Sequence, residues 1–463
     1  MALAMARDKM PTSRVRRSAT VGRLAATEAV KQFGTRAANV TRGEDAAEEA
    51  LGRRQLETAK QIVAVLGTMK GAAMKLGQVL SFLDVGLVPE QYREEFQLEL
   101  AKLRDAAPQV SFKQMRKVLE EDLEAPIDEV FAEFDEDAIA AASIGQVYRA
   151  TLPDGRLVAV KVQYPGVASA VRSDMRNLGV ILRLLKGLAP GLDVRGTAEE
   201  IRTRIDEELD YELEAQNQRR MAALYRGHPF IHVPDVITSL SREHVLVSEF
   251  VEGVGFEELR TRDATERDRL GEIIFRFFFG SMYRHHEFSG DPHPGNFLLR
   301  SDGRVSFLDF GLYKRIEPSV AEFELQAARL YVGGDGEGLI EHLREGGFID
   351  AGRQDHARVL EQFRELTWWY LTDEDVELEP EIASQVAINM TDPRSPYYDQ
   401  MRHESLPPEH LFGRRLELLT LAVLSQLHAT GNWYRIFCEW CFHDPPVTEL
   451  GRQETDFYRD AAA

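Results

Sequence analysis

The sequence predicts an α+β fold in which a β-rich region with one long helix precedes a larger helical region. Short β-branched runs separated by turns begin near residue 139, and helical apolar spacing dominates from about residue 253 to the end. A further helical pattern lies before the β-rich region. The 463 residues are too many for one compact core, so we expect two or three structural units.

The composition is that of a globular protein, with 44% hydrophobic and 29% charged residues. A formal net charge of -20 argues against nucleic acid as a partner, because phosphate contacts need clustered Lys and Arg. No apolar stretch reaches the roughly 18 residues that cross a bilayer. We therefore expect a cytoplasmic or membrane-peripheral protein without a transmembrane segment.

Residues 1–44 form a basic leader that departs from this acidic trend. The first 42 residues contain nine Lys and Arg against only Asp8 and Glu28. Such a leader can lie on anionic lipid as a peripheral membrane contact, resemble an organelle transit peptide, or be a flexible solvated terminus. We expect it to be flexible.

The first elements are a helical extension and a β-hairpin. Residues 45–105 have helical apolar periodicity, and a second helical pattern over 112–121 is closed off by Pro126. Residues 147–150 and 157–162 are rich in β-branched residues and flank a Pro-Asp-Gly turn, which predicts two strands joined as a hairpin.

Further along, the pattern predicts a long helix from about residue 198 to 224 and strands at 232–237 and 244–250. A second small hairpin is expected around 297–310. The predicted domains are the leader 1–44, the helical extension 45–110, a β-rich lobe 111–252 and a helical lobe 253–463.

Lys161 ends the run Val-Ala-Val-Lys within the second predicted strand, where its ammonium can reach the phosphates of a nucleotide. The next helix supplies acids: Glu207, Asp210 and Glu214 recur at spacings that place them on one helix face. One of these acids can form an ion pair with Lys161.

Two further motifs follow in the helical region. Asp291 and Asn296 have the D-x4-N spacing of a kinase catalytic loop, and an Asp-Phe-Gly triplet begins at Asp309. Asn296 and Asp309 are hard oxygen donors suited to Mg²⁺, and Asp291 can orient or deprotonate the phosphoryl acceptor. With Lys161, these motifs predict a protein-kinase-like bilobal fold that uses ATP or ADP and Mg²⁺.

The segment from Val247 to Gly253 fits the hinge of such a fold, with Glu249 and Val251 expected to contact the nucleotide through their backbone. The alternative interpretation is an edge strand followed by a linker.

The loop expected to cover the phosphates is rich in alanine. It keeps Gly145 and Val147 of the G-x-G-x-x-G-x-V pattern, but Ala140 and Ala142 replace the first two glycines, with Ala141 and Ser143 also in the loop. Because the alanine Cβ disfavours positive φ and holds the backbone away from phosphates, we expect altered nucleotide binding.

Three features together resemble the ABC1 (UbiB, ADCK, COQ8-like) family of atypical kinases. They are the alanine run before Ile-Gly-Gln-Val, a K-x-G-Q motif formed by Lys75 and Gln78, and an E-x-D motif formed by Glu208 and Asp210 and followed by Glu214. Lys75 and Gln78 share a helix face, whereas Glu208 and Asp210 do not, so either the helix starts near them or they have different partners.

This resemblance implies an N-terminal helix that folds over the active site and brings Lys75 to the E-x-D acids, restricting access by protein substrates. It implies catalytic roles for Lys75, Gln78, Lys161, Glu214 and Asp291. It also implies ATPase-like activity that supports isoprenoid quinone or lipid metabolism, with a lipid or quinone-like small molecule as a partner.

Departures from ordinary protein kinases leave two alternatives open. Ser289 and Gly290, rather than an arginine, directly precede Asp291. No Ala-Pro-Glu follows Gly311 before Pro318, and such a short segment leaves little platform for a peptide substrate. The alternatives are a small-molecule phosphotransferase resembling aminoglycoside or choline kinases, and a non-catalytic nucleotide-sensing scaffold.

Cys438 and Cys441, the only two cysteines, form a C-x-x-C pair in an apolar setting. A structural zinc site needs four ligands and no second pair exists, so we expect core thiols in a reducing cytoplasm.

Overall fold

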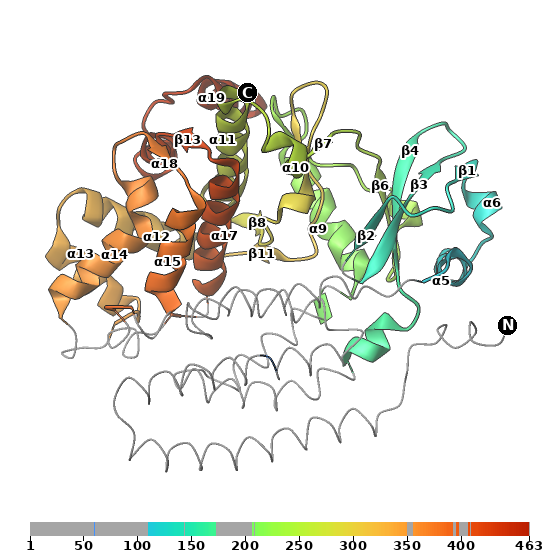
Figure 1. Cartoon of the computed structure of the whole chain (residues 1–463), viewed down its shortest axis with the longest axis horizontal. Coiled ribbons are helices and arrows are strands. Elements are labelled where there is room, and N and C mark those ends of the chain that lie inside the picture. The colour runs from blue at the N-terminus through green and yellow to red at the C-terminus, as the bar shows by residue number, and fades with distance from the viewer. Residues whose placement is uncertain are drawn as a thin grey trace, which may run out of the picture. The chain divides into compact units, whose positions relative to one another are not determined.

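The computed structural model describes residue 60 and residues 110–142, 144–172, 206–207, 209–349, 355–391, 395–397, 406–407 and 409–462. The chain divides into two compact units, one formed by residues 1–212 and 239–247, the other by residues 213–238 and 248–463. Helices and sheets occur in both (Figure 1), so the predicted α+β class is confirmed. The predicted leader and nearly all of the predicted helical extension lie outside the described residues.

The first unit is built on a five-stranded sheet. Its strands follow the order β1 (Glu133–Phe134), β3 (Gly145–Thr151), β4 (Leu157–Gln163) and β6 (Val245–Glu249), and β2 (Ala140–Ala142) also pairs with β3. Strands β3 and β4 form the predicted hairpin, and Gly155 in its turn has φ +85°, a conformation that favours glycine. Helices α5 (Phe112–Leu123) and α6 (Ile127–Val130) precede the sheet.

Alternation along β4 separates its core residues from its functional face. Val158, Val160 and Val162 are fully buried on one face, whereas Lys161 lies on the other face and is half-buried. The sheet core therefore fixes the direction in which the Lys161 side chain projects.

The second unit contains the helical lobe and three small sheets. Its elements in chain order are most of α9 (Tyr211–Leu224), then β5 (Ile231–His232), β7 (Val254–Gly255), α10 (Phe256–Leu259), α11 (Ala264–Gly280), η3 (Ser281–His285), β8 (Glu287–Ser289), η4 (Pro294–Asn296), β9 (Phe297–Leu299), β10 (Val305–Phe307), β11 (Tyr313–Arg315), α12 (Pro318–Val332), α13 (Gly336–Glu345), α14 (His356–Leu371), β12 (Val376–Glu377), α15 (Pro380–Thr391), α17 (Leu411–Leu427), β13 (Thr430–Gly431), α18 (Trp433–Cys441) and α19 (Glu449–Ala462). A short 3-10 turn, η2 (Thr238–Leu240), lies at the boundary between the units.

Helix α11 forms the centre of the second unit. The Asp263 side chain caps its start by accepting a hydrogen bond from the Glu266 amide, and the helix packs against α17 and α18. In Figure 1 α11 and α17 run side by side. Arg276 on α11 is fully buried and pairs with Glu272, Glu439 and Glu454, so it joins α11 to α18 and α19.

In the described part of the chain, no helix combines the length and the apolar character needed to cross a membrane. The apolar run within α11 is instead part of the protein core, since Ile273, Phe275 and Phe279 are fully buried there.

Two of the small sheets hold the loops that carry the predicted motifs. One sheet has the order β5-β10-β9-β7, and the other is the antiparallel pair β11-β8. The Asp291 loop joins β8 to β9, and the Asp309 loop joins β10 to β11. The hairpin expected around residues 297–310 is confirmed as β9 and β10.

Two predicted boundaries are wrong. The strand expected at 232–237 is reduced to Ile231–His232 with an isolated bridge from Val236 to Ser248, because Pro234 interrupts the run. The helix expected from about residue 198 is not continuous, since Leu209 lies in a turn and Asp210 has no regular structure before α9 begins at Tyr211.

Candidate nucleotide site

The alanine-rich segment forms strand β2 of a tight hairpin. Ala140 pairs with Val147, Ala141 with Gln146, and Ala142 with Gly145. Ala140 and Ala141 are exposed, and Ala142 is half-buried. Ser143 lies outside the described residues.

This extended conformation corrects part of the sequence argument about Ala140 and Ala142. Neither alanine has a positive φ, so alanine is not strained there and glycine is not needed for backbone conformation. What remains is the methyl group itself, which limits how closely another molecule can approach the strand.

Gly145, by contrast, is required by its neighbours. A Cβ atom at this position would lie 2.2 Å from the Val162 carbonyl oxygen and 3.1 Å from the Tyr211 hydroxyl. The close approach of β3 to β4 is therefore enough to explain why this position holds a glycine.

Lys161 lies on β4 opposite Val147 of β3. Its Nζ atom lies 4.9 Å from the centroid of the Tyr211 ring, a distance suited to a cation–π interaction. Sequence reasoning did not assign Tyr211 a role; its only signal is an aromatic residue directly after the E-x-D motif.

Asp210 caps helix α9, because its Oδ1 atom accepts a hydrogen bond from the Glu212 amide at 3.0 Å. The expectation that Glu207, Asp210 and Glu214 share one helix face is wrong, since only Glu214 lies within α9. The helix therefore starts beside the E-x-D motif, as one of the two sequence interpretations required. Glu208, Lys75 and Gln78 lie outside the described residues.

The predicted hinge begins at the end of β6. The Glu249 amide donates to the Asp235 carbonyl, and its carboxylate pairs with His232 at 3.2 Å and Arg300 at 3.5 Å. The hydrogen bond from His232 holds the pKa of Glu249 below its usual range. The Glu249 side chain is thus engaged with His232 and Arg300, while none of these hydrogen bonds uses its backbone carbonyl. Val251 is buried.

The Asp291 loop is folded back on itself by its own hydrogen bonds. The His293 amide donates to the Asp291 carbonyl at 2.7 Å, and the Asn296 side-chain nitrogen donates to the same carbonyl at 3.2 Å. Because the amide nitrogen of Asn296 is engaged on one branch, its oxygen occupies the other branch, where a cation can bind.

Backbone hydrogen bonds hold the Asp309 loop against the Asp291 loop. The Gly290 amide donates to the Leu312 carbonyl at 2.7 Å, and the Leu308 amide donates to the Asn296 carbonyl at 2.9 Å. The Ser289 hydroxyl also donates to the Asp309 carbonyl at 3.1 Å. Asn296 and Asp309, the two predicted metal ligands, are therefore brought together by the β8–β11 region of the second unit.

Glu214 joins this group from helix α9. A Cβ atom placed on Gly311 would lie 3.5 Å from a Glu214 carboxylate oxygen and 3.5 Å from Asp309 Oδ1, so both carboxylates flank Gly311. Glu214 is buried, with 3% exposure, and Asn217 one turn later donates to the Phe310 carbonyl. The buried Glu214 carboxylate is thus held beside the Asp-Phe-Gly triplet.

The segment after the Asp-Phe-Gly triplet is short. Strand β11 begins two residues after Gly311, and α12 begins at Pro318. The structure thus places a strand and a helix directly after the triplet, and the expectation about peptide substrates stays a prediction.

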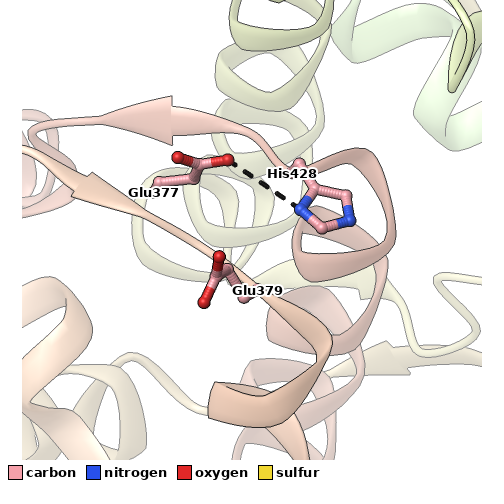
Figure 2. Close-up of side chains that lie close together, drawn as sticks. All are labelled: Glu377, Glu379 and His428. Carbon is pink, nitrogen blue, oxygen red and sulfur yellow. Dashed lines mark ion pairs between the residues drawn. The ribbon is translucent and has the colours of Figure 1, made fainter.

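Outside this region, one group of potential metal ligands occurs among the described residues. Figure 2 shows Glu377, Glu379 and His428, with an ion pair of 3.9 Å between His428 and Glu377. Both glutamates are exposed and the ion pair accounts for the proximity, so we assign no metal there.

Cys438 and Cys441 are free and buried on α18, as the sequence predicted. Burial raises the pKa of the Cys438 thiol to about 11 and that of the Cys441 thiol to about 12. Both are therefore protonated near neutral pH and are suited to packing rather than to metal binding or redox chemistry.

The order of the strands and the paired motif loops define a protein-kinase-like fold. A solved structure supports this: the chain aligns with a TM-score of 0.62 and 32% identity to Rv3197 from Mycobacterium tuberculosis, described as a complex with erythromycin, over 86% of this chain and 100% of that one. Residues 102–342 match the ABC1 atypical kinase-like domain. The chain belongs to this family.

Curated relatives include the atypical kinase COQ8B, mitochondrial, of Rattus norvegicus, which is 31% identical over 63% of this chain and 54% of its own length. The AarF domain-containing protein kinase 1 of Mus musculus is 32% identical over 71% of this chain and 64% of its own length. The chain thus spans about half to two thirds of these relatives.

Proposed function

We propose that the chain is a Mg-dependent, ATP-binding atypical kinase or ATPase that supports isoprenoid quinone or lipid metabolism rather than phosphorylating proteins in trans. The observation that carries this proposal is the pairing of the Asp291 and Asp309 loops, with Asn296, Asp309 and Glu214 gathered in one region. Membership in a family of atypical kinases supports the same reaction class.

The donor set fits a magnesium ion. Asn296 and Asp309 offer an amide oxygen and a carboxylate, the hard ligands that Mg²⁺ prefers, and they would hold the ion in this proposal. When bound, the ion neutralises charge on the nucleotide phosphates.

The remaining residues have separate tasks. Lys161 contacts the α and β phosphates, and Asp291 accepts a hydrogen bond from the acceptor hydroxyl or water and orients it. We further propose that Lys75 and Gln78 restrict the acceptor side.

The lipid or quinone part of the proposal is supported by two features. The segment between Gly311 and Pro318 is too short to present a peptide, which favours a small acceptor or water. The basic leader provides clustered positive charge for anionic lipid, so a peripheral membrane contact is part of the proposal.

The test is phosphate release from Mg-ATP, measured with and without vesicles of anionic phospholipid. We expect Asp309→Asn and Asp291→Asn each to lower the rate by about hundredfold or more, because the first removes a proposed magnesium ligand and the second removes the group that would orient the acceptor. Asp302→Asn is the matched control: Asp302 lies in the β9–β10 turn and pairs with Arg300 and Arg304. It should leave the rate within about twofold of wild type.

Three results would redirect the proposal. Wild-type release equal to that of Asp309→Asn under both conditions would indicate a nucleotide-sensing scaffold. Phosphorylation of a soluble alcohol at ordinary turnover rates would indicate a small-molecule phosphotransferase. Equal losses in Asp309→Asn and the Asp302→Asn control would show that the assignment of Asp309 is wrong.

A second candidate function is binding of a macrolide-like ligand, favoured by the erythromycin complex of the Mycobacterium tuberculosis relative. Calorimetric titration with erythromycin tests it. Saturable binding that persists in Asp309→Asn would support a separate ligand site, and absence of heat at saturating erythromycin would reject this function.

A further inference from the structure

Tyr211 directly follows the E-x-D motif but is not one of the motif residues. It is the first residue of α9 and is 1% exposed. Its amide donates a hydrogen bond to the Glu243 carbonyl at 3.0 Å, which fixes the backbone from which its ring projects. The ring is therefore held in place before any ligand binds.

Gln163 on strand β4 is hydrogen-bonded to the backbone next to Tyr211. This side chain is fully buried, and its Nε2 atom donates to the carbonyls of Leu209 at 2.8 Å and Glu243 at 3.3 Å. Lys161 and Gln163 are two apart on β4, so they share a face of the strand. Gln163 therefore contacts the backbone just before α9, at Leu209, and Lys161 contacts the ring of Tyr211, the first residue of α9.

The Tyr211 hydroxyl end reaches the phosphate-covering hairpin. A Cβ atom on Gly145 would lie 3.1 Å from this hydroxyl, and Gly145 pairs with Gln163 across β3 and β4. One buried side chain thus extends from the Lys161 ammonium to the base of the Ala140–Ala142 hairpin.

We propose that Tyr211 is a positioning residue that holds Lys161 for nucleotide phosphates, by a cation–π interaction between its ring and the ammonium. This inference rests on the proposed function, because it concerns the affinity of the same site for Mg-ATP. An ammonium has three N–H donors, so Lys161 can lie against the ring and still donate to phosphate oxygens. Holding a flexible side chain in its binding position raises affinity, because less ordering is needed when the ligand arrives.

The experiment measures the Mg-ATP dissociation constant by titration calorimetry on the full chain. Tyr211→Leu should weaken binding about fivefold to tenfold, whereas Tyr211→Phe keeps the ring and should stay within about twofold. In a Lys161→Met background, Tyr211→Leu should cause no further loss, since the residue acts through the ammonium.

A series of phenylalanine analogues at position 211, carrying one to three ring fluorines, keeps the fold testable if Tyr211→Leu does not fold. Fluorine withdraws charge from the ring face with little change in size, so affinity should fall stepwise along the series. A flat series, or an equal additional loss in the Lys161→Met background, would overturn the inference and leave Tyr211 a packing residue.

The Asp309→Asn variant separates this failure from failure of the proposed function. If wild type binds Mg-ATP and Asp309→Asn binds it weakly, a flat fluorine series rejects only the role of Tyr211. If wild type and Asp309→Asn bind Mg-ATP equally, or neither binds it, the proposed function itself is rejected, and the inference with it.

Discussion

At the scale of single residues, the β2–β3 hairpin contains a glycine that the fold requires and alanines that it does not. Gly145 cannot gain a Cβ atom without displacing the Val162 carbonyl. Ala140 and Ala142 lie in an extended strand where either alanine or glycine fits the backbone. The fold therefore explains the glycine but not the alanines, and under the proposed function their methyl groups limit how closely the nucleotide approaches the strand.

We predict that Ala140→Gly and Ala142→Gly raise the affinity for Mg-ATP relative to Mg-ADP by several-fold. Removing the methyl group lets the backbone approach the phosphates more closely, and the nucleotide with the additional phosphate gains more from that approach. Dissociation constants for both nucleotides, measured by calorimetry, test the prediction, with Gly255→Ala as a control because a Cβ there meets nothing within 4 Å. An unchanged ratio in both alanine variants would show that the alanines are incidental.

At the scale of elements, helix α19 is joined to the rest of the second unit by buried polar groups. Glu454 on α19 pairs with Arg276 at 2.9 Å and lies 3.7 Å from His228. His285, at the end of η3, lies 2.9 Å from the Tyr458 hydroxyl of the same helix. The contact between α19 and the rest of the second unit therefore includes ionisable groups, and their protonation affects the stability of the fold.

Because of His285, we predict that the free energy of unfolding depends on pH. Burial, with the nearby Arg284 charge, lowers the pKa of His285 to about 4. A histidine with a depressed folded-state pKa stabilises the fold above its unfolded pKa of about 6.5, and this stability is lost as the pH falls toward 4.

The measurement is the free energy of unfolding in urea at several pH values between 7 and 4. His285→Gln should reduce the slope of stability with pH in this range by up to about 1.4 kcal/mol per pH unit, the limit for one proton. His356→Gln is the control, because His356 is an exposed residue at the start of α14. Parallel curves for wild type and His285→Gln would contradict the assignment.

At the scale of the whole molecule, the sequence predicted most of what is local. The β3–β4 hairpin, the β9–β10 hairpin and the buried C-x-x-C thiols are each set by short-range patterns of alternation, turn residues and apolar spacing. The positions of Lys161, Asp291 and Asp309 as motif residues also follow from short spacings, although their roles remain proposals.

What the sequence did not predict depends on tertiary contacts. Residues 198–224 read as one helix because acidic and apolar spacing continues across the break at Asp210, where capping by Asp210 and the backbone bond from Tyr211 to Glu243 start a new helix. The placement of Tyr211 beside Lys161, and of Glu214 beside Gly311, joins residues distant in sequence, and no local pattern encodes such pairs.

Whether Asp309 helps to hold a magnesium-nucleotide complex is tested most directly by calorimetric titration of Mg-ATP into wild type, Asp309→Asn and the Asp302→Asn control. We expect saturable binding that excess EDTA abolishes, an affinity at least about tenfold weaker in Asp309→Asn, and near wild-type affinity in Asp302→Asn. Affinities that are the same in all three proteins, or binding that EDTA leaves unchanged, would contradict this role of Asp309.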